Sequence, residues 1–242
     1  AKAKADGHTL LFATSSHAAN LALYKKPGYD LLKDFAPVSL VSFIPNVLVV
    51  SSSSPAGTVA EFIKLAKASA NSLNYGSAGN GTSSHLAAAE FTALAGINMQ
   101  HVPFRGGAPA NQELLAGRLD VVFAPMVEVL PFVEGGKLKA LGVTSAKRSP
   151  RMPNVPAIGE ALPGYKSELW NSLMAPAGTP APVIDQIPAA VQNVLKDAEV
   201  RKQFESQGTV PVGSTPADFA RMLPTEIADW AKTVKSANAS LD

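Results

Sequence analysis

Apolar and polar positions follow two different patterns along the chain, one typical of strands and one typical of helices. Apolar runs rich in Val, Leu and Phe, bounded by Gly, Pro or Ser, predict strands at 9–13, 38–41, 47–50, 73–76, 100–103, 120–124, 138–144 and 173–175. Between them apolar residues recur at helical spacing, as Val59, Phe62 and Ala66 do within 58–70. Similar stripes predict helices over 182–196 and 216–235. This alternation predicts an α/β protein with largely parallel sheets.

The order of the elements predicts two domains. Residues 58–144 read as helix and strand in strict alternation, which is enough for a domain with its own sheet. The C-terminal part is mostly helical and is expected to pack on a sheet formed by the N-terminal residues. We therefore predict one domain at 51–145 and a discontinuous one made of 1–50 and 146–242. The Ser- and Pro-rich segment 51–57 suits a crossing between domains, although an ordinary surface loop has the same composition.

Composition narrows the chemistry. The chain has 242 residues, of which 46% are apolar and 17% charged, so it can bury a sizeable core. Its net charge is +2 and it has no basic block, which argues against a nucleic-acid partner. It has no cysteine, and its four histidines lack metal-binding spacing. We therefore expect neither a metal nor another cofactor.

The stretch 74–85, Asn-Tyr-Gly-Ser-Ala-Gly-Asn-Gly-Thr-Ser-Ser-His, carries the strongest chemical signal. Glycines allow a tight turn, and the hydroxyl residues that follow stand at the start of a helix-like run. The first turn of a helix has unpaired N–H groups and a partial positive charge, which suits a carboxylate or phosphate. A purely structural turn is the alternative. A P-loop is disfavoured because Thr82 stands where its lysine belongs, and the glycine spacing is not that of a Rossmann motif.

Two further junctions end strands in the same way. Arg105 precedes a glycine pair and could bind a carboxylate, or could equally be a solvated surface arginine. Phe123 lies at the end of the strand 120–124, and Thr14 and Ser15 follow the strand 9–13. In open α/β sheets ligands bind beyond the C-terminal ends of strands, so these residues are candidates for the wall of a cleft. Trp170 is expected to serve packing rather than ligand stacking.

Catalytic patterns are weak. The chain has no Gly-x-Ser-x-Gly elbow and no paired carboxylates near the glycine loops. We therefore expect a binding protein without catalytic residues. The alternative is an α/β enzyme that acts on a small carboxylated or phosphorylated metabolite.

Several motifs occur in order along essentially the whole chain, at 6–11, 34–38, 74–85, 101–110, 117–121, 135–144 and 170–180. In this combination the chain resembles the Bug-type solute receptors, the periplasmic binding components of tripartite tricarboxylate transporters. The resemblance implies a two-lobed type II periplasmic-binding architecture that closes on a small carboxylate and delivers it to membrane transporter subunits. It leaves open whether the ligand is a dicarboxylate, an amino acid or an aromatic acid.

The resemblance also implies ligand contacts made by backbone and hydroxyl groups, often through water. By position these fall on Thr14 and Ser15 in the first lobe and on Ser77, Asn80, Gly81, Thr82 and Ser83 in the second. Members of the family begin with a strand and a Pro-Gly-Gly loop that this sequence lacks. We therefore expect that an N-terminal segment is missing, that ligand affinity is affected, and that a sheet edge is exposed.

Overall fold

The computed structural model describes residues 1–69 and 73–236. The chain forms two compact units, unit 1 from Ala1–Phe43 with Leu169–Asp242 and unit 2 from Ile44–Glu168. It passes between them within β2 (Phe35–Ser51) and at the start of β7 (Glu168–Pro176). The sequence predicted domain boundaries at 50/51 and 145/146. The boundaries of the two units lie instead within the strands β2 and β7 that connect them.

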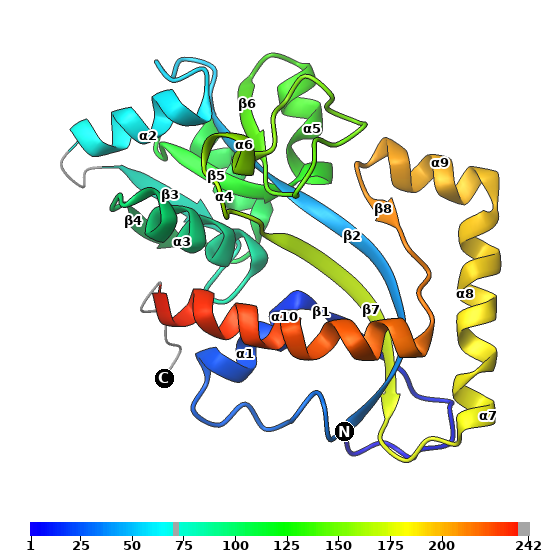
Figure 1. Ribbon diagram of the computed structural model, residues 1–242. Coiled ribbons are helices and arrows are strands. Elements are labelled where there is room, and N and C mark those ends of the chain that lie inside the picture. The colour runs from blue at the N-terminus through cyan, green and yellow to red at the C-terminus, as the bar shows by residue number, and fades with distance from the viewer. Residues whose placement is uncertain (70–72, 237–242) are drawn as a thin grey trace. The chain divides into compact units, whose positions relative to one another are not determined.

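Unit 2 is built on a sheet in the order β6-β2-β5-β3-β4 (Figure 1). Its strands besides β2 are β3 (Asn74–Ser77), β4 (Gln100–Pro103), β5 (Val121–Pro125) and β6 (Leu138–Val143). β3 runs parallel to β4 and β5, whereas β2 runs antiparallel to β5 and β6. The C-terminal ends of β3, β4 and β5 therefore lie along one edge.

Helices cover both faces of this sheet. They are α2 (Val59–Ala68), α3 (Ser83–Ala95), α4 (Gly107–Leu115), α5 (Met126–Glu134) and α6 (Ile158–Ala161). Because side chains alternate along a strand, Leu48 and Val50 of β2 join the core under α2, α3 and α6. Val47 and Val49 join the second core, under α4 and α5. The alternation predicted for 58–144 is confirmed element by element.

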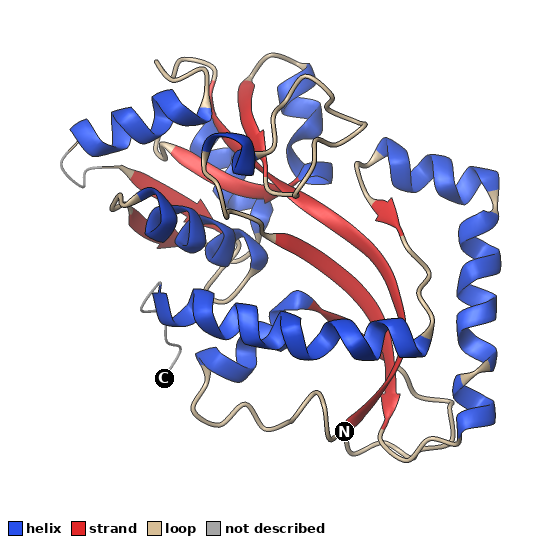
Figure 2. Cartoon of the chain, in the orientation of Figure 1, coloured by secondary structure: helices blue, strands red, loops and turns tan. Residues whose placement is uncertain are grey.

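Unit 1 contains β1 (Leu11–Thr14), which pairs antiparallel with β7, and β8 (Val210–Pro211), which pairs antiparallel with β2. Its helices are α1 (Ser15–Leu23), α7 (Ala181–Ile184), α8 (Gln186–Lys196), α9 (Ala198–Ser206) and α10 (Pro216–Ser236) (Figure 2). Trp170 is completely buried, packs edge-on against Phe219 and donates from Nε1 to Glu226 over 2.9 Å. The packing role predicted for Trp170 is confirmed.

The α/β class is confirmed, but the sheets are mixed. The parallel arrangement holds for β5, β3 and β4, whereas β1–β7, β2–β5, β2–β6 and β2–β8 are antiparallel. The strands predicted at 38–41 and 47–50 are one strand, β2. Pro45 lies between the stretch of β2 that pairs with β8 and the stretch that pairs with β5.

No helix within 1–69 and 73–236 is both long enough and apolar enough to cross a membrane.

Close packing around Gly142 of β6 yields a stability prediction. A Cβ there would lie 2.7 Å from Ile158 Cγ1 and 3.0 Å from Val59 Cγ2. We expect Gly142→Ala to lower the free energy of unfolding by about 1–3 kcal/mol through overpacking, measured by urea denaturation. In the control Gly57→Ala the new Cβ would lie 3.4 Å from Glu61 Oε2, an ordinary contact. The control should change stability by less than about 0.5 kcal/mol, and equal effects would contradict the packing account.

Candidate functional site

The glycine-rich segment forms a tight loop from the end of β3 to the start of α3. Gly79 and Gly81 have φ angles of +128° and +73°, which residues with a side chain rarely adopt. A Cβ on Gly79 would also lie 3.2 Å from the carbonyl oxygen of Phe104. Both glycines are therefore required for the chain to turn from the strand into the helix at this point.

Side chains in the first turn of α3 hold the loop in shape. Ser84 Oγ accepts a hydrogen bond from the N–H of Ala78 over 2.9 Å. His85 Nδ1 accepts one from the N–H of Gly81 over 3.1 Å. Because these loop amides are already bonded, they position the loop and are not free to bind a ligand.

The N–H groups in the first turn of α3, by contrast, are uncapped. Thr82 is the N-cap residue, but its side chain makes no capping hydrogen bond. Its hydroxyl instead donates to the carbonyl of Gly79 over 2.7 Å and lies 2.9 Å from Ser84 Oγ. An uncapped helix start has unsatisfied N–H groups and the positive end of the helix dipole, which together attract an anion.

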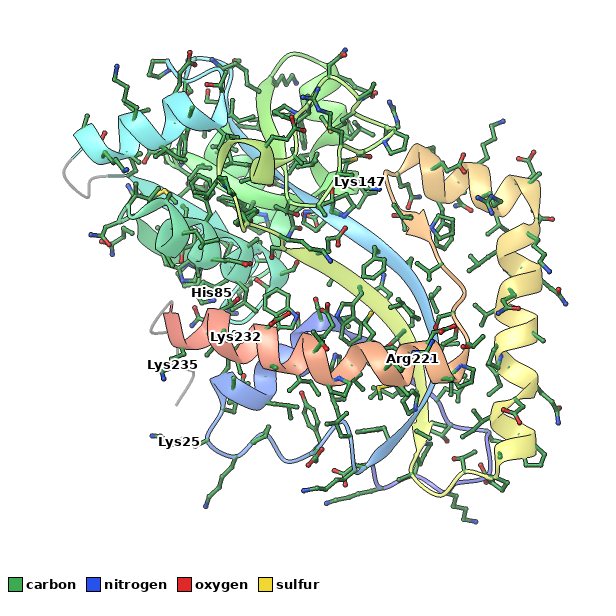
Figure 3. The ribbon with its side chains drawn as sticks, in the orientation of Figure 1. Lys25, His85, Lys147, Arg221, Lys232 and Lys235 are labelled. Atoms are coloured by element: carbon green, nitrogen blue, oxygen red, sulfur yellow. The ribbon has the colours of Figure 1, made fainter. Side chains whose placement is uncertain are left out.

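Three rings stack beside the loop. Tyr75 and His101 face each other across β3 and β4, with ring centroids 4.8 Å apart, and His85 stacks on His101 at 4.1 Å (His85 is labelled in Figure 3). Burial, and secondarily the neighbouring His85, lower the pKa of His101 to about 4. Burial also lowers the pKa of His85 and raises the pKa of Tyr75 to about 12. All three rings are therefore uncharged at neutral pH.

Ser77 belongs to the same cluster. It is completely buried, and its Oγ lies 2.7 Å from His101 Nε2. The N–H of Gly79 donates to this oxygen over 3.1 Å. Ser77 therefore connects the ring stack to the loop and helps to hold the loop in its conformation.

The other predicted residues of unit 2 lie at different depths. Asn80 is exposed at the tip of the loop, Gly81 is buried, and Ser83 is 9% exposed at the first position of α3. Phe123 is completely buried, and its ring packs 5.4 Å from that of Phe91 in the core. The structure thus brings the loop residues together at the helix start but places Phe123 in the core beneath it.

Arg105 lies beside the glycine-rich loop. The N–H groups of its neighbours Phe104 and Gly106 donate to the carbonyls of Ser77 and Ala78 over 3.0 and 3.1 Å. Arg105 itself is exposed. The segment that carries Arg105 is thereby fixed next to the glycine-rich loop.

The start of α4, however, already holds a carboxylate of the chain. A Cβ on Gly107, the first residue of α4, would lie 2.0 Å from Oε2 of Glu128. Asn111 Nδ2 donates to the same oxygen over 3.3 Å. Burial raises the pKa of Glu128, and the Asn111 hydrogen bond partly opposes this shift. The second glycine junction is therefore a poorer anion site than the first.

Unit 1 has a helix start that a histidine side chain also holds in place. Thr14 is the N-cap of α1, and its N–H donates to His17 Nδ1 over 3.1 Å. Ser15, the first residue of α1, is 1% exposed, and its Oγ has no hydrogen-bond partner in the part of the chain that the structure describes. A buried hydroxyl without a partner is rare, so it points to a group outside the chain.

The two helix starts share a sequence signal that our sequence analysis missed. Residues 14–17 and 82–85 are both Thr-Ser-Ser-His. In each copy the histidine is the third helical residue and its Nδ1 accepts a backbone N–H from the residues just before the helix. The repeated tetrapeptide could have identified His17 and His85 as residues that shape the two sites.

No cluster of three or more metal-ligating side chains occurs among the residues described, 1–69 and 73–236.

Comparison with known proteins identifies the class of the molecule. The chain superimposes on the periplasmic binding protein BugD with a TM-score of 0.87 and 28% identity, covering 99% of this chain and 81% of that one. The fold is therefore that of the periplasmic binding proteins. More narrowly, the chain belongs to the tripartite tricarboxylate transporter receptor family, whose sequence profile matches residues 1–239. The resemblance to Bug-type receptors is confirmed.

Similar relatives include proteins solved with ligands. A protein of R. palustris solved with adipate is 34% identical, with a TM-score of 0.89 over 99% of this chain and 81% of that chain. MatC from Rhodopseudomonas palustris, solved with bound malate, is 33% identical, with a TM-score of 0.84 over 96% and 81%. BugT from Bordetella pertussis is 32% identical and is covered over 75% of its length by the whole of this chain.

The ring stack predicts how stability depends on pH. The folded pKa of His101 is about 4, below its ordinary value of 6.5, so the unfolded chain binds more protons between these values. Stability should therefore be fully present above about pH 6.5 and be lost as the pH falls toward about 4. We expect His101→Gln to flatten this fall, measured by urea denaturation at several pH values. Replacing the exposed His8 by Gln is the control, and an unchanged profile in His101→Gln would contradict the assignment.

Proposed function

We propose that this protein is a periplasmic receptor that binds a small carboxylate at the start of α3 and delivers it to the membrane subunits of a tripartite tricarboxylate transporter. The uncapped first turn of α3 carries the proposal, because the Thr82 hydroxyl is directed to Gly79 and leaves the helix N–H groups for a ligand. Family membership and the relatives solved with adipate and malate support it.

The electrostatics of unit 2 suit reversible binding of an anion. His85 and His101 are uncharged at neutral pH, so the loop presents no full positive charge from its own rings. The partial charge of the helix start favours a carboxylate modestly, and the exposed Arg105 adds a longer-range attraction. We assign direct contact to Asn80, Thr82 and Ser83.

The remaining predicted residues divide by burial. Ser77 and Gly81 are buried and bonded within the loop, so they position the groups that bind. In unit 1 we assign Thr14 and Ser15 to ligand binding, because the buried hydroxyl of Ser15 has no hydrogen-bond partner among the described residues and can donate to a ligand. Phe123 is left out of the contacts, since it is completely buried against Phe91.

We further propose that binding occurs without turnover. The Ser77 and His101 side chains are 2.7 Å apart, which is the distance of a nucleophile and its base. Ser77 is completely buried, however, and its hydroxyl is also bonded to Gly79. Adipate or malate incubated with the protein should be recovered unchanged, as judged by NMR of the small molecule. A product whose formation is lost in Ser77→Ala would establish the enzyme alternative.

The amide contribution can be tested at Ser83. Proline is tolerated at the first helical position, and Thr82 has φ −75° and ψ 162°, which suits a residue before proline. Ser83→Pro removes both the N–H and the hydroxyl, whereas the control Ser83→Ala removes the hydroxyl alone. A hydrogen bond to a charged group contributes about 1.5–3 kcal/mol, so we expect Ser83→Pro to bind carboxylates about ten- to a hundredfold more weakly than Ser83→Ala.

Calorimetry with malate, adipate, an amino acid and an aromatic acid measures these affinities, and it also identifies which class binds. Thermal denaturation checks that both variants fold. Equal affinities in the two variants would remove the N–H of Ser83 from the site. Failure of the unmodified protein to bind any of these acids would overturn the proposed function.

A further inference from the structure

Two buried polar side chains of unit 2 have no hydrogen-bond partner among the residues described. Asn46 in β2 is 0% exposed, and neither its Oδ1 nor its Nδ2 is bonded. Ser167, 3% exposed, has an unbonded Oγ. A buried polar group without a partner is costly, and an apolar residue of similar size would avoid that cost. The pair therefore points to a partner that is not part of the chain.

The two residues are joined through Thr144. The N–H of Asn46 donates to Thr144 Oγ1, and the N–H of Thr144 donates to the carbonyl of Asn46, both over 2.9 Å. The N–H of Ser167 donates to the carbonyl of Thr144, also over 2.9 Å. Asn46, Thr144 and Ser167 thus lie on three hydrogen-bonded segments of the same unit.

This group lies on the same edge and the same face as the start of α3. Asn46 pairs with Pro125, the last residue of β5, and β5 runs parallel to β3. By alternation Asn46 shares a face of β2 with Leu48, whose core lies under α3. The hydroxyl of Tyr165 donates to the carbonyl of Ala87 in α3 over 3.0 Å, which holds the segment leading to Ser167 against that helix.

The chemistry of the pair favours a ligand group that both donates and accepts hydrogen bonds, because such a group would satisfy both the oxygen and the nitrogen of Asn46. A carboxamide and a hydroxyl are uncharged, and each both donates and accepts. A hydroxyl group needs a donor and an acceptor together, whereas a carboxylate only accepts and an ammonium only donates. Asn46 is completely buried, so binding requires its side chain to rotate. No hydrogen bond among the described residues opposes that rotation.

We propose that Asn46 and Ser167 form a second polar subsite that binds a hydroxyl group on the carbon chain of the carboxylate held at α3. The inference rests on the proposed function and deepens it, because it makes a hydroxy acid the preferred ligand.

Malate and succinate differ only in the hydroxyl group, so their affinities isolate this subsite. We expect calorimetry to show that the unmodified protein binds the better enantiomer of malate at least about tenfold more tightly than succinate. In Asn46→Leu the ratio should fall to near one, with the affinity for succinate unchanged. Without ligand, Asn46→Leu should melt at the same or a higher temperature, because an unsatisfied polar group has been removed.

Ser39→Ala is the matched control, since Ser39 is a completely buried polar residue of β2 whose hydroxyl is bonded to the carbonyl of Ser214 over 2.9 Å. It should lower the melting temperature and keep the malate preference. Ser167→Ala provides a second variant if Asn46→Leu does not fold, and should reduce the same ratio.

A malate preference that survives in the variants, or that is absent from the unmodified protein while both acids bind, would overturn the subsite and leave the proposed function intact. Binding of neither acid nor of any other carboxylate would overturn both.

Discussion

The uncapped start of α3 is the feature on which the account of this protein depends. A helix start is normally satisfied by the side chain of its N-cap residue. Here the hydroxyl of Thr82 is bonded to the carbonyl of Gly79 instead, and the positive φ angles of Gly79 and Gly81 make that geometry possible. The sheet edge, the loop and the ring stack all serve to hold this helix start in place with its N–H groups unused.

The hydrogen bonds around this helix start also fix the conformation of the loop. Ser84 and His85 take up the N–H groups of Ala78 and Gly81, and the loop is further tied to β4 through His101 and Ser77. The groups that position the site are therefore distinct from those that bind. Burial keeps the rings of His85 and His101 neutral by lowering their pKa values. The same burial makes the region sensitive to acid, because a protonated ring carries a charge that is costly to keep buried.

Local signals made much of the fold predictable. The helix 58–70 and the alternation through 144 follow from side-chain periodicity, and the glycine-rich loop follows from Gly79 and Gly81. The features that could not be predicted from the sequence depend on contacts between residues far apart in the chain. The stacking of Tyr75 on His101 follows from the register of β3 and β4, and the carboxylate of Glu128 over Gly107 follows from the packing of α5 beside α4. Asn46 fell in the gap between the strands predicted at 38–41 and 47–50, because nothing near it in sequence shows that β2 continues through it.

The most direct test of the central claim is the response of individual backbone amides to a carboxylate. In a titration with malate or adipate followed by two-dimensional NMR, the amide signals of Ser83 and Ser84 should shift saturably. The already bonded amides of Ala78 and Gly81 should move much less. Saturable shifts that leave the first turn of α3 unchanged would contradict the account.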